Sequence, residues 1–359
     1  MKTVLHDVFD LGQSAWLDYI SRDLIASGGL AEWIEKGVVG VTTNPSIFEN
    51  AIAKTSDYDK EIADLAAKGQ SASDIYETLT LQEVGAAADI MRPVYDKTKG
   101  VDGYVSLEVN PLLASDKETT ISEAKRLFVI LNRPNVMIKI PATPEGIEAL
   151  SECIAAGVNV NSTLIFSEEQ YAGVAKAYIK GLKARAAKGE SLSVASVASV
   201  FVSRVDTAVD KALSEKGESA FCGKIAVDSI RLTYQRFKSI FSGSDWDGLK
   251  AKGARVQRPL WASTGTKNPA YSDIKYVQEL IGPDTVNTIP PKTLDAFVNH
   301  GKATSALEDG LDAAKADMKH LSELGINLSA VCDKLLADGL ESFNGAFRSL
   351  ISSIEKKAK

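Results

Sequence analysis

The sequence predicts an α/β fold in which eight parallel strands close into a (β/α)₈ barrel. Short apolar runs alternate with longer segments of helical pattern, and this alternation is typical of βα units and a parallel sheet. There are eight such runs, and a chain of 359 residues suits one barrel with insertions. Strand pattern alone does not separate a barrel from an open sheet, so the count of eight decides for the barrel. We expect residues 1–359 to form a single barrel domain.

The elements follow one another in a regular order along the chain. The expected strands are Ala15–Tyr19, Val38–Asn44, Tyr104–Val109, Val136–Pro141, Val158–Phe166, Val197–Val202, Arg258–Ser263 and Thr285–Pro290. Pro144 suits the first turn of the helix after the fourth strand. Ser167, followed by two glutamates, is a typical cap for the helix after the fifth strand.

Three regions exceed what a minimal barrel needs. Ser46–Arg92 is long for one connection and predicts two helices inserted after the second strand. Trp246-Asp247-Gly248 lies in another insertion, before the seventh strand. Asp317–Glu323 and Leu328–Glu355 predict terminal helices that pack over the barrel.

The composition excludes several classes of protein. A net charge of −6 without a basic stripe argues against a nucleic-acid or anionic-membrane partner. No apolar stretch approaches the ~20 residues of a membrane span, and the first residues lack a signal-peptide core. Three widely spaced cysteines indicate free thiols in a reducing compartment, and three scattered histidines give little support for a zinc site. We expect a cytoplasmic protein.

Lys139 is the most informative residue. It lies in the middle of an apolar strand, Val136–Pro141, which offers no obvious place for a charge, and lysine is almost never fully buried unless it is paired or has a task. Burial disfavours the charged form of an amine, as a lysine nucleophile requires. The alternatives are a Schiff-base lysine and an ion-paired lysine at a sheet edge, and this strand alone does not decide between them.

The neighbouring strands favour the first alternative. Strand side chains alternate between two faces, and one face of a barrel points inward. A packed barrel interior is normally aliphatic, so polar side chains there need partners or a task. The alternation places six polar residues inside, on five strands: Asp18, Glu108, Lys139, Asn161, Thr163 and Ser199. We interpret them as a site.

The residues in this group suit carbonyl chemistry. A neutral lysine and a carbonyl form a carbinolamine and then an imine, and each step moves protons between nearby acids and bases. Asp18 and Glu108 are the interior carboxylates, while Asn44, Asn161 and Thr163 can hold hydroxyls or a water without adding charge. A static salt bridge would instead be expected among apolar neighbours.

Two polar clusters follow the later strands. Ser203-Arg204-Val205-Asp206 ends the sixth strand, and Thr264-Gly265-Thr266-Lys267-Asn268 follows the seventh. Loops after the last strands of such barrels commonly bind phosphate, and a Gly/Thr-rich turn with a lysine suits an anion. Together with a Schiff-base lysine, Arg204 and Lys267 indicate a phosphorylated sugar.

These segments together resemble the transaldolase family, in order and over nearly the whole chain. The matching stretches are Thr42–Ser46, Ser106–Val109, Ile138–Thr143, Asn159–Ser167, Ser199–Arg204 and Trp261–Asn268. The Thr-Thr-Asn-Pro and Ile-Lys-Ile-Pro stretches are specific at this spacing. The length is similar to that of a longer bacterial subfamily.

The resemblance implies a reaction. Members of the family transfer a dihydroxyacetone unit in the pentose phosphate pathway, converting sedoheptulose 7-phosphate and glyceraldehyde 3-phosphate to erythrose 4-phosphate and fructose 6-phosphate. They use no metal or organic cofactor. The expected partners are therefore sugar-phosphate substrates, with no nucleic acid and no membrane, for a monomer or homodimer.

The resemblance also implies roles for individual residues. Lys139 forms the Schiff base, and Asp18 takes the proton from the C4 hydroxyl. Glu108 and Thr163 hold the water that shuttles protons. The implied substrate contacts are Asn44, Asn161 and Ser199 at the dihydroxyacetone part, Phe201 beside them, and Arg204 with Lys267 at the phosphate.

One position departs from the family pattern, and three alternative functions stay open. The best-known transaldolases have arginine where this chain has Lys267, and lysine lacks the bidentate fork. Fructose-6-phosphate aldolases resemble transaldolases but have a tyrosine-centred water site, so Glu108 and Phe201 favour transaldolase. A pyridoxal-phosphate barrel enzyme would need a more glycine-rich phosphate cup than Thr264-Gly265-Thr266. A catalytically silent sugar-phosphate binding protein would have little use for six interior polar residues.

Overall fold

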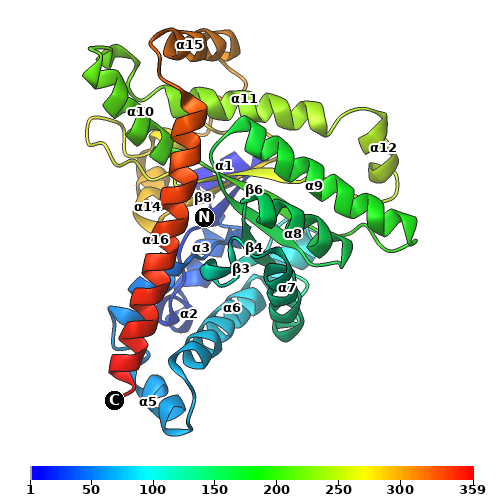
Figure 1. The fold of residues 1–359 in the computed structure, drawn as a ribbon, viewed down its shortest axis with the longest axis vertical. Helices are drawn as coiled ribbons and strands as arrows, with labels where there is room; N and C mark the ends of the chain where they lie inside the picture. The colour runs from blue at the N-terminus through cyan, green and yellow to red at the C-terminus, as the bar shows by residue number, and fades with distance from the viewer. Residues whose placement is uncertain (1) are drawn as a thin grey trace.

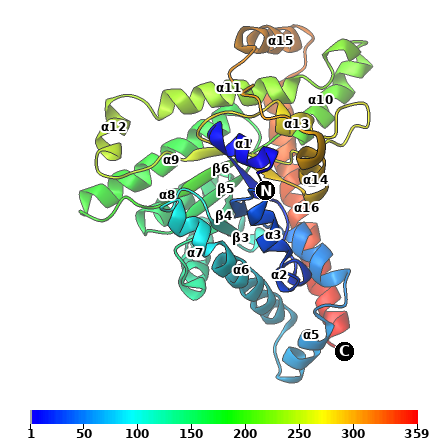
Figure 2. The same cartoon turned by 180° about the vertical axis from the view of Figure 1, so that it is seen from behind.

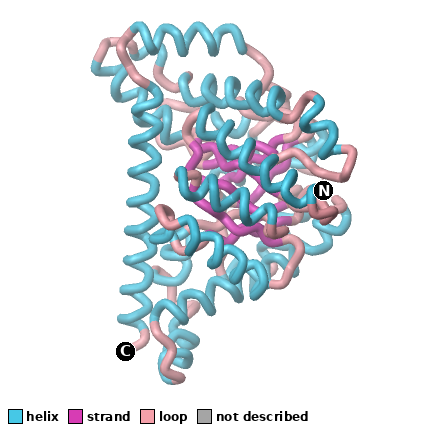
Figure 3. Tube along the Cα trace, turned by 45° about the vertical axis from the view of Figure 1, so that its right-hand side comes forward, coloured by secondary structure: helices cyan, strands magenta, loops and turns pink. Residues whose placement is uncertain are grey.

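A closed parallel barrel forms the centre of the molecule. The computed structural model describes residues 2–359, and its strands neighbour one another in the order β1-β2-β3-β4-β5-β6-β7-β8, with β8 pairing back to β1. Figure 3 shows the strands inside a layer of helices. The strands are β1 Gln13–Leu17, β2 Gly40–Val41, β3 Tyr104–Glu108, β4 Val136–Pro141, β5 Val160–Ile165, β6 Ser196–Phe201, β7 Arg258–Ala262 and β8 Thr285–Ile289. The predicted barrel is confirmed.

The helices surround this barrel and extend beyond it. Those of the first half are α1 Val4–Asp10, α2 Arg22–Ala26, α3 Gly29–Glu35, α4 Pro45–Phe48, the π-helix η1 Glu49–Ala53, α5 Asp59–Ala67, α6 Ala72–Lys97, the 3₁₀ turn η2 Pro111–Leu113, α7 Lys117–Leu131, α8 Pro144–Ala155 and α9 Glu168–Ala187. Those of the second half are α10 Ser203–Glu215, η3 Ser219–Phe221, α11 Ile225–Ile240, α12 Ser244–Lys250, α13 Lys275–Gln278, α14 Pro291–His300, α15 Leu311–Glu323 and α16 Leu328–Lys357.

The predicted insertions are present. The segment expected to hold two helices after β2 contains α5 and α6, preceded by the short α4 and η1; α6 packs on β3, as a barrel helix does. The insertion before β7 is α12, and the terminal helices are α15 and α16. Pro144 occupies the first turn of α8, and the Ser167 hydroxyl caps α9 by accepting from the Gln170 amide. Several strand ends differ from prediction: β1 lies two residues earlier, β5 begins two residues later, and β2 is limited to Gly40–Val41, with Asn44 already capping α4. The other differences are of one residue.

The strand register explains why polar side chains gather inside. Glu108 pairs with Lys139, and Lys139 pairs with Asn161, so the three side chains point the same way from adjacent strands. Trp16 fills the interior next to Gly40, where an added Cβ would lie 2.5 Å from the indole ring. Only glycine fits there, so Gly40 makes room for the large ring.

A buried carboxylate lies at the amino-terminal end of the barrel. Asp102 is fully buried and accepts hydrogen bonds from Ser14 Oγ at 2.8 Å, Trp16 Nε1 at 3.0 Å and Arg258 Nη2 at 2.8 Å. A buried charge is tolerated when it is paired and hydrogen-bonded in this way. This network joins the starts of β1 and β7 to the segment before β3, and the strands finish at the opposite end of the barrel.

The long helix α16 crosses this opposite end. In Figure 1 it runs from the region of α10 to that of α5, and Figure 2 shows it behind the barrel. It packs on α4, α6 and α10 and on β5. At the carboxyl end of α16, Lys357 Nζ pairs with Asp59 Oδ1 at 2.5 Å. The helix is therefore attached to the barrel along its length and forms part of the covering of the barrel mouth.

No helix within residues 2–359 is long and apolar enough to cross a membrane. The three cysteines are unpaired; Cys153 and Cys332 are buried, and Cys222 is half-buried.

Candidate active site

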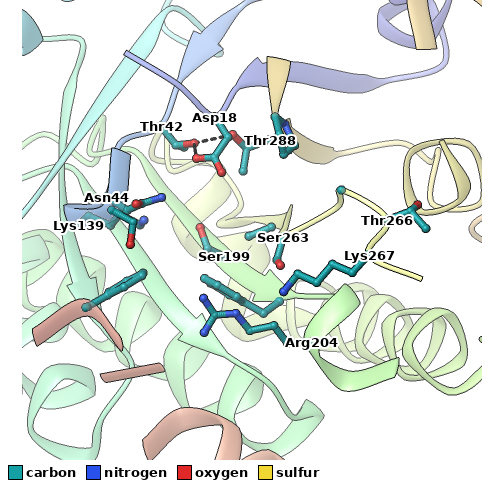
Figure 4. Close-up of a pocket in the computed structure, with 16 residues that line it drawn as sticks. Asp18, Thr42, Asn44, Lys139, Ser199, Arg204, Ser263, Thr266, Lys267 and Thr288 are labelled. Atoms are coloured by element: carbon teal, nitrogen blue, oxygen red, sulfur yellow. Dashed lines mark hydrogen bonds between the residues drawn. The ribbon is translucent and has the colours of Figure 1, made fainter. Parts of the chain in front are cut away.

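A cavity of about 350 Å³ opens at the carboxyl ends of the strands. Active sites of (β/α)₈ enzymes lie at this end because the βα loops converge there. Figure 4 shows the residues around the cavity, which come from β4, β6, β7 and β8, from the segments that follow β1, β2, β7 and β8, and from α4, α10 and α16. They are Asp18, Thr42, Asn44, Ser46, Lys139, Ser199, Phe201, Arg204, Ala262, Ser263, Gly265, Thr266, Lys267, Thr288, Pro290 and Phe343.

Lys139 places its amine at one side of this cavity. The residue is 5% exposed, and Nζ donates to the Thr43 carbonyl at 3.0 Å. Nζ also lies 3.4 Å from Glu108 Oε2, which is an ion pair longer than a good hydrogen bond. The Phe343 ring stands 5.7 Å from Nζ. The amine is thus held by one carbonyl and one carboxylate and shielded by an aromatic wall, while it still faces the cavity.

Asp18 follows the end of β1 and is the carboxylate that lines the cavity. Its Oδ1 accepts from Thr42 Oγ1 at 2.7 Å, and Thr42 Oγ1 lies 2.5 Å from Thr288 Oγ1 (Figure 4). Burial raises the pKa of Asp18, and this rise is opposed by the Lys139 charge and by the Thr42 hydrogen bond. A carboxylate with a raised pKa and a hydrogen bond that orients it suits a general base.

Glu108 and Thr163 lie near Lys139 but do not line the cavity. Burial raises the pKa of Glu108, Lys139 opposes the rise, and the negative charge of Asp18 adds to it. Neither Glu108 carboxylate oxygen has a hydrogen-bond partner within residues 2–359, and the same holds for the Thr163 hydroxyl. Buried polar atoms are normally paired with protein or water, so the Glu108 carboxylate and the Thr163 hydroxyl each have capacity to bind a water.

Two asparagines support the hydroxyl-lined wall of the cavity. Ser199 Oγ donates to Asn161 Oδ1 at 2.7 Å, and Asn161 Nδ2 donates to Ser106 Oγ at 3.1 Å. Asn161 therefore lies behind Ser199 and does not itself line the cavity. Asn44 does line it; its Oδ1 accepts from the Ile47 amide as the cap of α4, which leaves the amide nitrogen available to a ligand.

Two cations stand at the other end of the cavity. In Figure 4 the charged ends of Arg204 and Lys267 point into the same part of the cavity, which is separate from the part that holds the Lys139 amine. Burial lowers the pKa of both groups, and the positive charge of Arg204 lowers that of Lys267 further. Within the described residues 2–359, no carboxylate lies within 4.0 Å of either cation. Phe201 forms the wall beneath, with its ring 5.4 Å from the Arg204 guanidinium.

The structure gathers the predicted residues into one place. Seven of them line the cavity, and the remaining three stand next to it: Glu108 and Asn161 contact Lys139 and Ser199, and Thr163 lies on β5 beside β4. The sequence analysis missed Thr288 and Phe343 as site residues. Thr288 follows the alternation of β8 and could have been found from it. Phe343 lies on α16, far along the chain, and its place in the helical pattern is that of any apolar residue on a packed helix face.

The side chains also limit what else could bind. Within residues 2–359 no group of three or more His, Cys, Asp or Glu side chains is arranged to hold a metal ion. The charged groups of the cavity are one carboxylate, one strand amine and two cations.

Comparison with known proteins places this arrangement in a family. Residues 15–354 match the family described as Transaldolase/Fructose-6-phosphate aldolase. A transaldolase of Trichodesmium erythraeum is 46% identical over 370 residues, covering 99% of this chain and 97% of the relative. The chain belongs to the transaldolase family. Transaldolase 1 of Streptomyces avermitilis is 47% identical over 98% of this chain and 94% of the relative, and the transaldolase of Thermobifida fusca is 45% identical over 99% of both.

Membership confirms the resemblance that the sequence indicated. The transaldolase family is one of enzymes, so the silent binding protein and the pyridoxal-phosphate barrel are no longer needed to explain Lys139. The assignment to a longer bacterial subfamily stays a prediction, as do the roles of the individual side chains.

Proposed function

We propose that the protein is a transaldolase that transfers a dihydroxyacetone unit between sugar phosphates through a Schiff base on Lys139. The observation that carries this proposal is the division of one cavity into two ends. At one end is the buried amine of Lys139, with Asp18 lining the cavity and Glu108 3.4 Å from Nζ. At the other end are Arg204 and Lys267, which have no carboxylate within 4.0 Å among residues 2–359. The first end suits a carbonyl, and the second suits a phosphate.

The proposed chemistry begins at the amine. Lys139 Nζ adds to the C2 carbonyl of the ketose, and the resulting carbinolamine loses water to give the iminium. The protons for this exchange pass through a water between Glu108 and Thr163. This role is supported by the Glu108 carboxylate 3.4 Å from Nζ and by the buried oxygens of both side chains, which have no hydrogen-bond partner within residues 2–359. Charged Glu108 also stabilises the positive charge that the iminium carries.

Cleavage requires a base on the other side of the substrate. Asp18 takes the proton from the C4 hydroxyl; the C3–C4 bond breaks, its electron pair moves to the iminium to give an enamine, and the aldose leaves. A second aldose enters, the enamine attacks its aldehyde carbon, and Asp18 returns the proton to the new hydroxyl. Asp18 suits this role because it lines the cavity and the Thr42 hydroxyl orients it.

The phosphate is proposed to bind between Arg204 and Lys267. Arg204 is half-buried and Lys267 is exposed, and the pKa of each is lowered. Cations whose hydration is reduced gain from a bound anion, because the anion replaces the hydration that was lost. Lys267 supplies charge without a bidentate fork, so we expect Arg204 to fix the orientation of the phosphate and Lys267 mainly to add affinity.

Fructose-6-phosphate aldolase is the second candidate, because the matched family includes both activities. Two observations favour transfer over simple cleavage. Phe201 presents a ring without a hydroxyl to the cavity, and a carboxylate, Glu108, stands beside the lysine amine. We further propose that the chain acts as one barrel domain in the cytoplasm, as a monomer or homodimer.

Borohydride trapping tests the proposal directly. The protein is incubated with fructose 6-phosphate and reduced, and the modified peptide is mapped by mass spectrometry. We expect one adduct, on Lys139, and transfer of the trapped unit to erythrose 4-phosphate when reduction is omitted. An adduct on another lysine, or none, would contradict the Schiff-base assignment. Release of free dihydroxyacetone at the rate of donor consumption would instead identify an aldolase.

A further inference from the structure

Arg204 and Lys267 are like charges that face the same small space. The positive charge of Arg204 lowers the pKa of Lys267, and within residues 2–359 neither group has a carboxylate within 4.0 Å. Two such cations repel each other until an anion binds between them. Their separation must therefore be imposed by the elements that carry them, which are the start of α10 for Arg204 and the β7–α13 connection for Lys267. We call residues 263–274 the Lys267 loop.

The Lys267 loop is fixed to β8 near its beginning. Thr264 Oγ1 donates to Asn287 Oδ1 at 2.9 Å and lies 3.0 Å from the Thr288 carbonyl. Further along, Thr266 Oγ1 donates to the Ser272 carbonyl at 2.8 Å. These contacts shape the loop itself. Its first residue is also joined to the start of α10, since the Ser203 amide donates to the Ser263 carbonyl at 3.1 Å and the two serine hydroxyls lie 3.0 Å apart. This contact fixes only the beginning of the loop, four residues before Lys267.

Two tyrosines beyond Lys267 make a second connection to α10: Tyr271 in the loop and Tyr276 on α13, which follows the loop. Tyr271 OH donates to Asp210 Oδ2 at 2.7 Å, and Tyr276 OH donates to Asp206 Oδ2 at 2.7 Å. Asp206 and Asp210 are four residues apart on α10, so they occupy one face of the helix that carries Arg204 in its first turn. We call these two contacts the tyrosine–aspartate clasps.

In each clasp, the carboxylate oxygen that does not bind the tyrosine accepts a hydrogen bond from a backbone amide. Asp206 Oδ1 accepts from the Ala226 amide at 2.8 Å, and Asp210 Oδ1 accepts from the Gly223 amide at 2.8 Å. Burial raises the pKa of Asp206 to about 6, and the bonds from the Ala226 amide and the Tyr276 hydroxyl oppose this rise. Charge-assisted hydrogen bonds held by two donors are short and directional, so the clasps fix the loop to α10 in one position.

We infer that Asp206, Asp210, Tyr271 and Tyr276 are positioning residues for phosphate recognition, because the two clasps hold Lys267 at the distance from Arg204 that an anion needs. This inference rests on the proposed function. A purely structural role would lower the stability of the protein without changing its preference for phosphorylated ligands. A positioning role changes that preference and leaves the chemistry at Lys139 unaltered.

The test removes only the hydroxyl of each clasp. Tyr271→Phe and Tyr276→Phe keep the rings in place. Tyr234→Phe is the matched control, since Tyr234 is a buried tyrosine on α11 whose hydroxyl donates to the Pro283 carbonyl at 3.1 Å and does not line the cavity. For each variant we measure the KM and kcat for fructose 6-phosphate, the inhibition constant of inorganic phosphate, and the rate of borohydride-trapped adduct formation with dihydroxyacetone, which has no phosphate.

We expect each clasp variant to raise the KM and the phosphate inhibition constant about three- to tenfold, as is common for residues that act through a network. The kcat and the rate of the dihydroxyacetone adduct stay within about twofold of the unaltered protein, and the control changes none of these values. In the Lys267→Ala variant, Tyr271→Phe and Tyr276→Phe cause no further increase in the KM or in the phosphate inhibition constant. The effects of residues that act through one group are not additive.

Three results would overturn the inference. These are an unchanged phosphate inhibition constant in both clasp variants, an equal loss with dihydroxyacetone, and a full additional loss in the Lys267→Ala background. If the unaltered protein forms no adduct on Lys139, the proposed function fails and the inference fails with it. An adduct on Lys139 together with any of the three results overturns the inference alone.

Discussion

Replacing Thr42 with valine is expected to move the pH dependence of catalysis without removing the catalytic base. Thr42 Oγ1 donates to Asp18 Oδ1 at 2.7 Å, and it receives a hydrogen bond from Thr288 Oγ1 at 2.5 Å. Because the donor stabilises the ionised carboxylate, it lowers the pKa of Asp18 against the rise that burial causes. Thr42→Val has nearly the same shape and removes only this donor.

The size and sign of the shift follow from the bond that is lost. A hydrogen bond to a charged group is worth about 1.5–3 kcal/mol, and about 1.4 kcal/mol corresponds to one pKa unit. The neutral carboxyl also accepts from the Thr42 hydroxyl, so only the difference between the two forms moves the pKa, and we expect a rise of about one unit. Asp18 must be ionised to accept a proton, so activity falls as the pH is lowered through its pKa. The acid limb of the kcat profile should therefore move to higher pH by about one unit.

The assay is the kcat for fructose 6-phosphate and erythrose 4-phosphate across pH, since this profile reports groups in the enzyme–substrate complex. Thr288→Val is the matched control, because it removes a partner of Thr42 and leaves the bond to Asp18 in place. The plateau at high pH should change little in either variant. An unmoved acid limb in Thr42→Val, or a plateau lowered 10²–10⁴-fold as for a lost base, would refute the reasoning.

Three further outcomes are expected. Lys139→Arg should preserve the fold, measured by circular dichroism, and abolish borohydride trapping, because a guanidinium does not deprotonate in proteins. Arg204→Ala should reduce kcat/KM for phosphorylated donors about ten- to hundredfold, and Lys267→Ala should do so more mildly; equal losses for unphosphorylated donors would show that neither cation binds phosphate. Burial and the neighbouring Asp317 raise the pKa of Asp228 to about 6. The contribution of Asp228 to the free energy of unfolding should therefore be lost as the pH rises through about 6. Urea unfolding of Asp228→Asn should not show this decline.

The barrel could be predicted because its signals are local. Each strand is a short apolar run, and side-chain alternation on a strand is fixed by geometry. The inward direction of Glu108, Lys139 and Asn161 follows from this alternation and from the parallel register. The strand ends could not be placed as well, since they depend on where a cap such as Asn44 ends the strand and begins a helix.

The site was predictable to the extent that strands and their following loops supply it. Lys139, Asp18 and Arg204 belong to such segments, and their proximity follows from barrel closure. The position of Asn161 behind Ser199 could not be predicted from the sequence, because it depends on the lengths of the two side chains and on the neighbours that each side chain reaches. Phe343 was missed because α16 reaches the cavity through tertiary packing, and a sequence does not reveal which helix face meets which strand.

The contribution of α16 to the cavity also bears on how the chain is synthesised. All eight strands have been translated once the ribosome passes Ile289, yet Phe343 follows only after α14, α15 and half of α16. A nascent or proteolytically clipped chain that ends before Phe343 retains Lys139 and both carboxylates but leaves the amine open to bulk water on that side. The active site is therefore complete only after the last part of the polypeptide has been synthesised. A fusion partner attached after α16 is placed next to the helix that completes the pocket.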